Sequence, residues 1–181
     1  MAESMDIVKL ADSDARLGPT DVIKPASGRQ DLKDWQSSVQ DLLRGLQRPR
    51  YVATGLLPEF ATLDGRHAFI KNHNMVGYSK DEWKKGDMTL EEKIRVYEEA
   101  MAKDPAADTE ELNRKLIDLD DIIYCEHHCS PGGVSLDDID LFARLRSITI
   151  VKGVVWPTKL RSYMDNMSEL ADIPLYDAMA M

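Results

Sequence analysis

Two cysteines and two histidines crowd into five consecutive residues, Cys125 to Cys129, and these are the side chains best suited to chemistry. Thiolates beside imidazoles bind zinc, but zinc ligands normally come as two separated pairs, with about two to four residues between the members of a pair. Cysteines at positions i and i+4 could reach disulfide distance if the segment is helical. We therefore interpret this segment as a structural or exposed loop, with redox and metal-binding roles as the alternatives.

The remaining polar side chains give weaker indications of chemistry. His73 has no cysteine or carboxylate at a useful spacing, and we expect it at the surface. Asp140 falls at the otherwise apolar start of a predicted helix, where a buried carboxylate needs hydrogen-bond partners, so we expect it to have a structural role. We assign no catalytic residue and no metal ligand from the sequence.

Composition and charge narrow the classes of partner. The chain has 181 residues, of which 43% are hydrophobic and 30% charged, as is usual for a globular domain. A net charge of −9 with sparse Lys and Arg argues against nucleic acid as a partner. No apolar run has the length of a membrane span, and the first residues show no signal-peptide pattern. Two cysteines do not form a disulfide framework, which favours a reducing cytoplasm.

The clearest element that positions these residues is a helix that begins at Ser135. Ser135 and Asp138 have the spacing of a capping box, in which each side chain satisfies a backbone N–H of the other residue. Val134 and Ile139 are spaced to form the hydrophobic staple that accompanies such a start. The following residues, to Val151, are apolar on most faces, which predicts a helix that is buried almost all round.

Helical spacing of apolar residues continues over most of the chain. From Asp31 the apolar residues recur at steps of three and four, and Pro49 is expected to end or kink this helix. Thr89 with Glu92 forms another predicted capping box, and a last helix is expected from about Thr158. No segment shows the strict alternation of a strand. The sequence therefore predicts an all-α domain with six or seven helices.

Several segments together resemble the glutaredoxin 2 family. The similarity covers nearly the whole chain, is most specific in the last third and is weakest between residues 72 and 129. The segments that carry it include Glu3-Ser4-Met5-Asp6-Ile7-Val8, Asp137-Asp138-Ile139-Asp140-Leu141-Phe142, Trp156-Pro157, Asp165-Asn166-Met167 and Ala178-Met179-Ala180.

The resemblance implies a fold and a division into domains. Members of this family join an N-terminal thioredoxin-like domain, with a CPYC redox motif, to a helical domain of the glutathione-transferase C-terminal type. The implied organisation is a last helix of the thioredoxin-like domain over residues 1–16, a linker over 17–28 and the helical domain over 29–181. We expect the rest of the thioredoxin-like domain, with its CPYC motif, to be missing from this chain.

The resemblance also implies a glutathione-binding pair, Glu3 and Ser4. In the family the equivalent pair holds the γ-glutamyl end of glutathione, and a helix N-terminus offers free N–H donors to a carboxylate. The alternative is that Ser4 only caps a helix at the start of the chain. Glutathione is the co-substrate that the family implies, and no metal is expected.

The expected function is that of the C-terminal portion of a glutathione-dependent thiol–disulfide oxidoreductase, located in the cytoplasm. Without a CPYC pair we expect the chain to be inactive alone, with glutathione and disulfides as partners once the missing domain is supplied. One alternative is a helical binding module, which self-associates through the apolar face that the missing domain leaves exposed. Another is a glutathione transferase.

Overall fold

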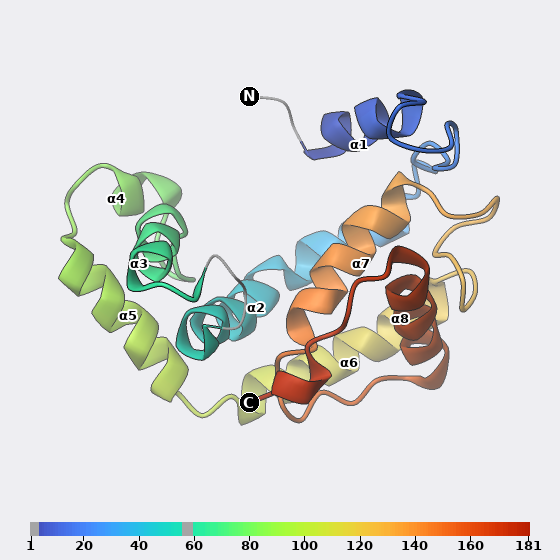
Figure 1. The fold of residues 1–181 in the computed structure, drawn as a ribbon. Coiled ribbons are helices and arrows are strands. Elements are labelled where there is room, and N and C mark those ends of the chain that lie inside the picture. Colours follow the sequence, from blue (N-terminus) through green and yellow to red (C-terminus); the bar gives the residue numbers. More distant parts are fainter. Residues whose placement is uncertain (1–3, 56–59) are drawn as a thin grey trace.

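The computed structural model describes residues 4–55 and 60–181, and the regular elements in these ranges are all helices. Helices α3, α4 and α5 gather on one side and α6, α7 and α8 on the other, with α2 extending between the two groups (Figure 1). The helices are α1 (Ser4–Ser13), α2 (Gln30–Thr54), α3 (Leu63–Asn72), α4 (Lys80–Lys84), α5 (Leu90–Ala102), α6 (Ala106–Ile122), α7 (Leu136–Ile148) and α8 (Thr158–Ala171), followed by a 3₁₀ helix over Asp177–Met179.

The all-α prediction is confirmed, and the described residues form eight α-helices, one more than the upper end of the expected range of six or seven. The extra helix is α4, whose five residues are too few to show helical periodicity. Its signal is a capping box, in which the Ser79 N–H donates to Glu82 and the Glu82 N–H donates to the Ser79 hydroxyl. A search for capping residues alone therefore finds a helix that periodicity misses.

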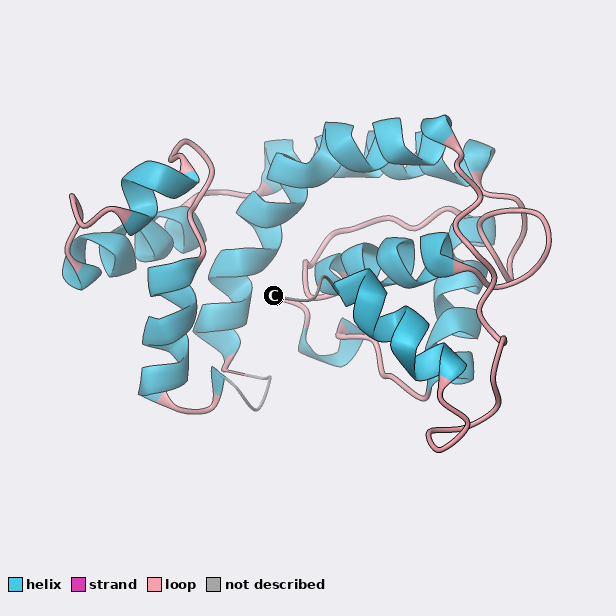
Figure 2. Ribbon diagram, turned by 90° about the horizontal axis from the view of Figure 1, so that it is seen from above, coloured by secondary structure: helices cyan, strands magenta, loops and turns pink. Residues whose placement is uncertain are grey.

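Helix α2 does not end at Pro49 but continues to Thr54. Figure 2 shows the helix bending in its second half, the effect expected of a proline in a helix interior. Next to the proline, the Arg50 guanidinium is buried and donates to the Leu46 carbonyl at 2.6 Å. The bend carries the end of α2 away from α7 and α8 and towards α3 and α5.

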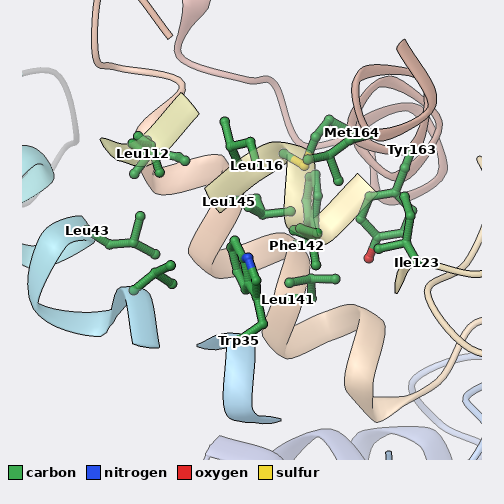
Figure 3. Close-up of a cluster of buried hydrophobic side chains, with 14 of the residues drawn as sticks. Trp35, Leu43, Leu112, Leu116, Ile123, Leu141, Phe142, Leu145, Tyr163 and Met164 are labelled. Carbon is green, nitrogen blue, oxygen red and sulfur yellow. The ribbon is translucent and has the colours of Figure 1, made fainter. Parts of the chain in front are cut away.

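The main hydrophobic core lies where α2, α6, α7 and α8 meet. Its centre is drawn in Figure 3, and one tryptophan also donates a hydrogen bond, from Trp35 Nε1 to the Lys115 carbonyl at 2.7 Å. The labelled residues of this core are Trp35, Leu43, Leu112, Leu116, Ile123, Leu141, Phe142, Leu145, Tyr163 and Met164.

A second, smaller hydrophobic cluster holds α3, α4 and α5 together. Ile70, Met75, Trp83 and Tyr97 are its buried members. Trp83 is fully buried, and its Nε1 donates to the Ile70 carbonyl at 2.7 Å. Among the residues that the structure describes, the two clusters share no buried member, so the two groups of helices are stabilised by largely separate packing.

Helix α1 has no buried residue and is held mainly through the chain that follows it. The Asp12 carboxylate accepts the backbone N–H groups of Val22 and Ile23 at 2.9 and 3.1 Å. The backbone of Lys24 then pairs with the chain around Ser135, just before α7.

None of the helices in the described part of the chain combines the length and apolarity needed to span a lipid bilayer.

Candidate functional site

The best-defined polar site is the buried carboxylate of Asp138, in the first turn of α7. One of its oxygens accepts the Ser135 N–H and hydroxyl, both at 2.9 Å, which confirms the predicted capping box. The other oxygen accepts the Cys129 N–H at 2.6 Å and the Tyr163 hydroxyl at 3.2 Å. Since Asp138 is 0% exposed, this network fixes the loop before α7 and ties it to α8.

The expectation that Asp140 is a buried carboxylate is wrong. Its side chain is 36% exposed and forms an ion pair with Arg144, one turn further along α7, at 3.2 Å. Asp138 faces the interior because it precedes the core residues Leu141 and Phe142 by about one helical turn. The carboxylate that braces the loop is therefore the capping residue itself.

The Cys125–Cys129 segment forms a turn between α6 and α7. Tyr124 N–H donates to the Cys129 carbonyl at 3.0 Å, and Cys125 N–H donates to the His128 carbonyl at 3.2 Å. His128 stacks on Tyr124, with its Nδ1 2.7 Å from the Ser130 carbonyl oxygen. Both cysteines are free thiols, and no group of three or more His, Cys, Asp or Glu side chains in the described ranges is arranged to hold a metal.

The two thiols differ in their surroundings. Cys129 is completely buried, and burial together with the nearby Asp138 carboxylate raises the pKa of its thiol far above the usual range. Cys125 is half-buried, and its Sγ lies 3.6 Å from the His128 carbonyl oxygen. Because the thiolate is the nucleophile in thiol–disulfide exchange, we expect the buried Cys129 thiol to be unreactive in the folded chain.

Because Cys125 and Cys129 differ in burial, we predict that their thiols differ in reactivity with a thiol reagent. With the native protein at neutral pH, we expect 5,5′-dithiobis(2-nitrobenzoic acid) to modify Cys125, and Cys129 only after unfolding in urea. Cys125→Ser should abolish the native reaction and Cys129→Ser should leave it unchanged. Fast modification of Cys129 in the folded chain would contradict this assignment.

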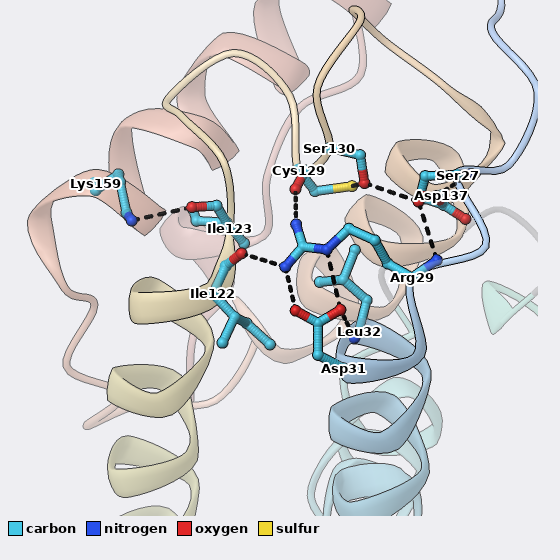
Figure 4. Close-up of polar contacts among 10 residues, drawn as sticks. All are labelled: Ser27, Arg29, Asp31, Leu32, Ile122, Ile123, Cys129, Ser130, Asp137 and Lys159. Carbon is cyan, nitrogen blue, oxygen red and sulfur yellow. Dashed lines mark hydrogen bonds and ion pairs between the residues drawn. The ribbon is translucent and has the colours of Figure 1, made fainter.

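Arg29, just before α2, connects the start of this helix to the end of α6 and to the turn that follows α6 (Figure 4). Its guanidinium donates to the Cys129 carbonyl at 2.7 Å and to the Ile122 carbonyl at 2.6 Å, and it pairs with Asp31. The ion pair raises the pKa of Arg29. Lys159 donates to the neighbouring Ile123 carbonyl at 3.1 Å, so two cations satisfy carbonyls at the end of α6.

Replacing Arg29 should therefore destabilise the fold. We expect Arg29→Met to lower the free energy of unfolding by about 1–3 kcal/mol, because the Cys129 and Ile122 carbonyls lose a charged donor. The measurement is urea unfolding followed by circular dichroism. Arg16→Met is the matched control, because Arg16 is exposed and, among the described residues, forms its ion pair with Asp14 alone. Equal stability of the two variants would show that the Arg29 contacts contribute nothing.

The structure describes only one member of the expected glutathione-binding pair. Ser4 is exposed and begins α1, whereas Glu3 lies outside the described residues.

The expectation of a surface position for His73 is wrong. This side chain is partly buried, stacks on Phe69 and has its Nδ1 2.9 Å from the Phe69 carbonyl oxygen. Burial lowers the pKa of His73.

Comparison with known proteins identifies the family. Residues 87–180, about half of the chain, match the family model described as glutaredoxin 2, C terminal domain. The chain belongs to the glutaredoxin 2 family. Glutaredoxin 2 of Escherichia coli K12 is 28% identical over 183 residues, an alignment that spans all of this chain and 73% of the relative. Glutaredoxin 2 of Escherichia coli O157:H7 aligns to the same extent.

A solved structure from the glutaredoxin 2 family has the same helical arrangement. The crystal structure of Salmonella typhimurium glutaredoxin 2, in complex with glutathione, superposes with a TM-score of 0.72 at 28% identity. The match covers all of this chain and 72% of that protein. The helices of this glutaredoxin 2 family member therefore form a bundle of the glutathione-transferase C-terminal type, as predicted.

Proposed function

We propose that this chain is the helical C-terminal portion of a glutathione-dependent thiol–disulfide oxidoreductase, located in the cytoplasm, and that it does not catalyse disulfide reduction by itself. In this reaction a thiolate attacks a disulfide, and glutathione then resolves the mixed disulfide. Membership of the glutaredoxin 2 family supports the assignment. The proposed organisation is a helix from a thioredoxin-like domain over residues 1–16, a linker over 17–28 and the helical domain over 29–181.

The proposed inactivity rests on the surroundings of the two cysteines. Cys129 is buried, and its raised pKa keeps the thiol protonated. Cys125 is placed in a turn of hydrogen-bonded backbone after a helix, not at a helix N-terminus, where the dipole lowers the pKa of a reactive thiol. Neither cysteine has the environment of an attacking nucleophile.

The direct test is turnover by the purified chain of 181 residues. Reduction of a small disulfide by glutathione, coupled to NADPH oxidation through glutathione reductase, is expected to proceed at the rate of the blank without protein. A variant with both Cys125→Ser and Cys129→Ser should give the same rate. A rate above the blank that disappears in this double variant would overturn the proposal.

We also propose that the N-terminus of α1 receives the γ-glutamyl end of glutathione, through Glu3 and Ser4. The complex of the Salmonella relative with glutathione supports glutathione as the ligand, and free N–H groups at a helix start suit a carboxylate. We expect Ser4→Ala to weaken glutathione binding about fivefold in an NMR titration, the effect of losing one hydrogen bond. Ser13→Ala, at the other end of the same helix, should leave it unchanged; equal effects would contradict the site.

Exposed apolar side chains on α1 and after it favour a second candidate function, a module that associates with another protein surface or with a second copy. Ile7, Leu10, Leu17 and Val22 are between 54% and 69% exposed. Contiguous exposed apolar surface marks interaction sites. Sedimentation equilibrium should then show self-association that Leu10→Glu weakens. A monomer at all concentrations, without dye-detectable apolar surface, would eliminate this candidate.

A further inference from the structure

A cavity of about 440 Å³ lies between the end of α2, α3 and the second half of α5. It is separate from the Asp138 network and from α1, and its size is in the usual range for small-molecule sites. Most of its walls are apolar. Residues that line it include Val52, Leu63, Ile70, Ile94, Tyr97 and Met101.

The polar groups of the cavity are few, and Tyr97 is already engaged. Its hydroxyl donates to the His73 carbonyl at 2.8 Å, so it is committed to the fold. Glu98 is exposed, whereas Arg66 and His67 are half-buried. Within the described part of the chain no ion pair involves Arg66. The guanidinium donates from Nε to the Phe60 carbonyl at 2.7 Å, and this bond holds it at the cavity.

The close approach of Gly55 also orients Arg66. Gly55 caps α2 in the left-handed conformation, with a φ of 62°. A Cβ atom at this position would lie 2.5 Å from an Arg66 terminal nitrogen and 3.2 Å from the Phe60 carbonyl oxygen. Glycine therefore gives the guanidinium room to lie against the end of α2. The Arg66 guanidinium thus lies against the end of α2, beside the apolar cavity that this residue lines.

We propose that this cavity binds a small amphipathic anion, whose apolar body fills the space between α2, α3 and α5 and whose carboxylate or sulfonate pairs with Arg66. An apolar body matches the lining, and a planar anion matches the fork of a guanidinium. Glutathione, a polar peptide with charged ends, does not have this chemistry. The cavity is also separate from Ser4 and from both cysteines, none of which lines it.

The test compares two probes on the full chain. 8-Anilinonaphthalene-1-sulfonate has an aromatic body with a sulfonate, and N-phenyl-1-naphthylamine has the same body without the charge. Fluorescence titration is expected to show one site that binds the sulfonate about tenfold more tightly than the neutral probe. Arg66→Met should remove this difference and leave the neutral probe unaffected.

Two further variants locate the site. Arg95→Met is the matched control, because Arg95 is an exposed arginine of α5 that does not line the cavity. Ala53→Trp places a bulky side chain at the cavity from an exposed position and should abolish binding of both probes. The proposal is overturned if Arg66→Met and Arg95→Met have the same preference for the sulfonate probe. It is also overturned if an Ala53→Trp variant that is folded by circular dichroism binds both probes with unchanged affinity, or if the titration shows several equivalent sites.

Discussion

Asp138→Ala should lower the free energy of unfolding by about 3–5 kcal/mol, because it leaves buried hydrogen-bond donors without an acceptor. The carboxylate accepts four hydrogen bonds, from the Cys129 and Ser135 N–H groups and from the Ser135 and Tyr163 hydroxyls. These donors come from the turn before α7, from its N-cap residue and from α8, and all three residues are buried. Such a loss is a large share of the roughly 5–15 kcal/mol that stabilises a typical domain.

Urea unfolding followed by circular dichroism measures this loss, and α7 supplies its own control. Asp140→Asn removes the partly exposed pair with Arg144 and should change stability by no more than about 0.5 kcal/mol. Asp138→Asn retains one acceptor oxygen and should fall between the other two variants. If Asp138→Ala and Asp140→Asn are equally stable, the buried network does not stabilise the start of α7.

Trp83→Ala should destabilise the smaller cluster by about 3–5 kcal/mol, because a fully buried indole is lost and a cavity is left. The Ile70 carbonyl also loses the indole N–H that it accepts. Since only four buried residues of the described chain make up this cluster, we expect α3, α4 and α5 to unfold locally. The larger cluster, which shares none of these residues, should remain folded.

Hydrogen exchange of backbone amides distinguishes local from global unfolding. In Trp83→Ala, protection should fall in α3, α4 and α5 and persist in α6, α7 and α8. The matched variant Trp35→Ala removes an indole from the main core and should lower protection throughout. A uniform loss of protection in both variants would show that the two clusters unfold as one unit.

The sequence-based predictions that the structure confirms depend on residues that are close together in the chain. Capping boxes at Ser135/Asp138 and Thr89/Glu92 need only a three-residue spacing, and both are present. The prediction for Asp140 is wrong although this residue is only two positions from Asp138. The helical repeat turns one carboxylate towards the core and the other towards Arg144.

Long-range contacts explain what the sequence did not indicate. Arg29 meets carbonyls that are 93 and 100 residues further along the chain, and no spacing rule connects such positions. The Arg66 cavity likewise requires three helices and the bend at Pro49. The spacing of Cys125 and Cys129 does not determine their chemistry. Burial and the nearby Asp138 carboxylate raise the pKa of the Cys129 thiol, and both come from the tertiary fold.

The pairing of Lys24 with the chain at Ser135 has a consequence for how α1 stays in place. Only about ten residues connect the end of α1 to this anchored point. If α1 detaches from α7, it can therefore rebind within the same molecule. A short tether of this kind gives an effective concentration on the order of millimolar. At that concentration weak contacts suffice, and a helix without one buried side chain keeps a defined position while its apolar residues stay available for a partner.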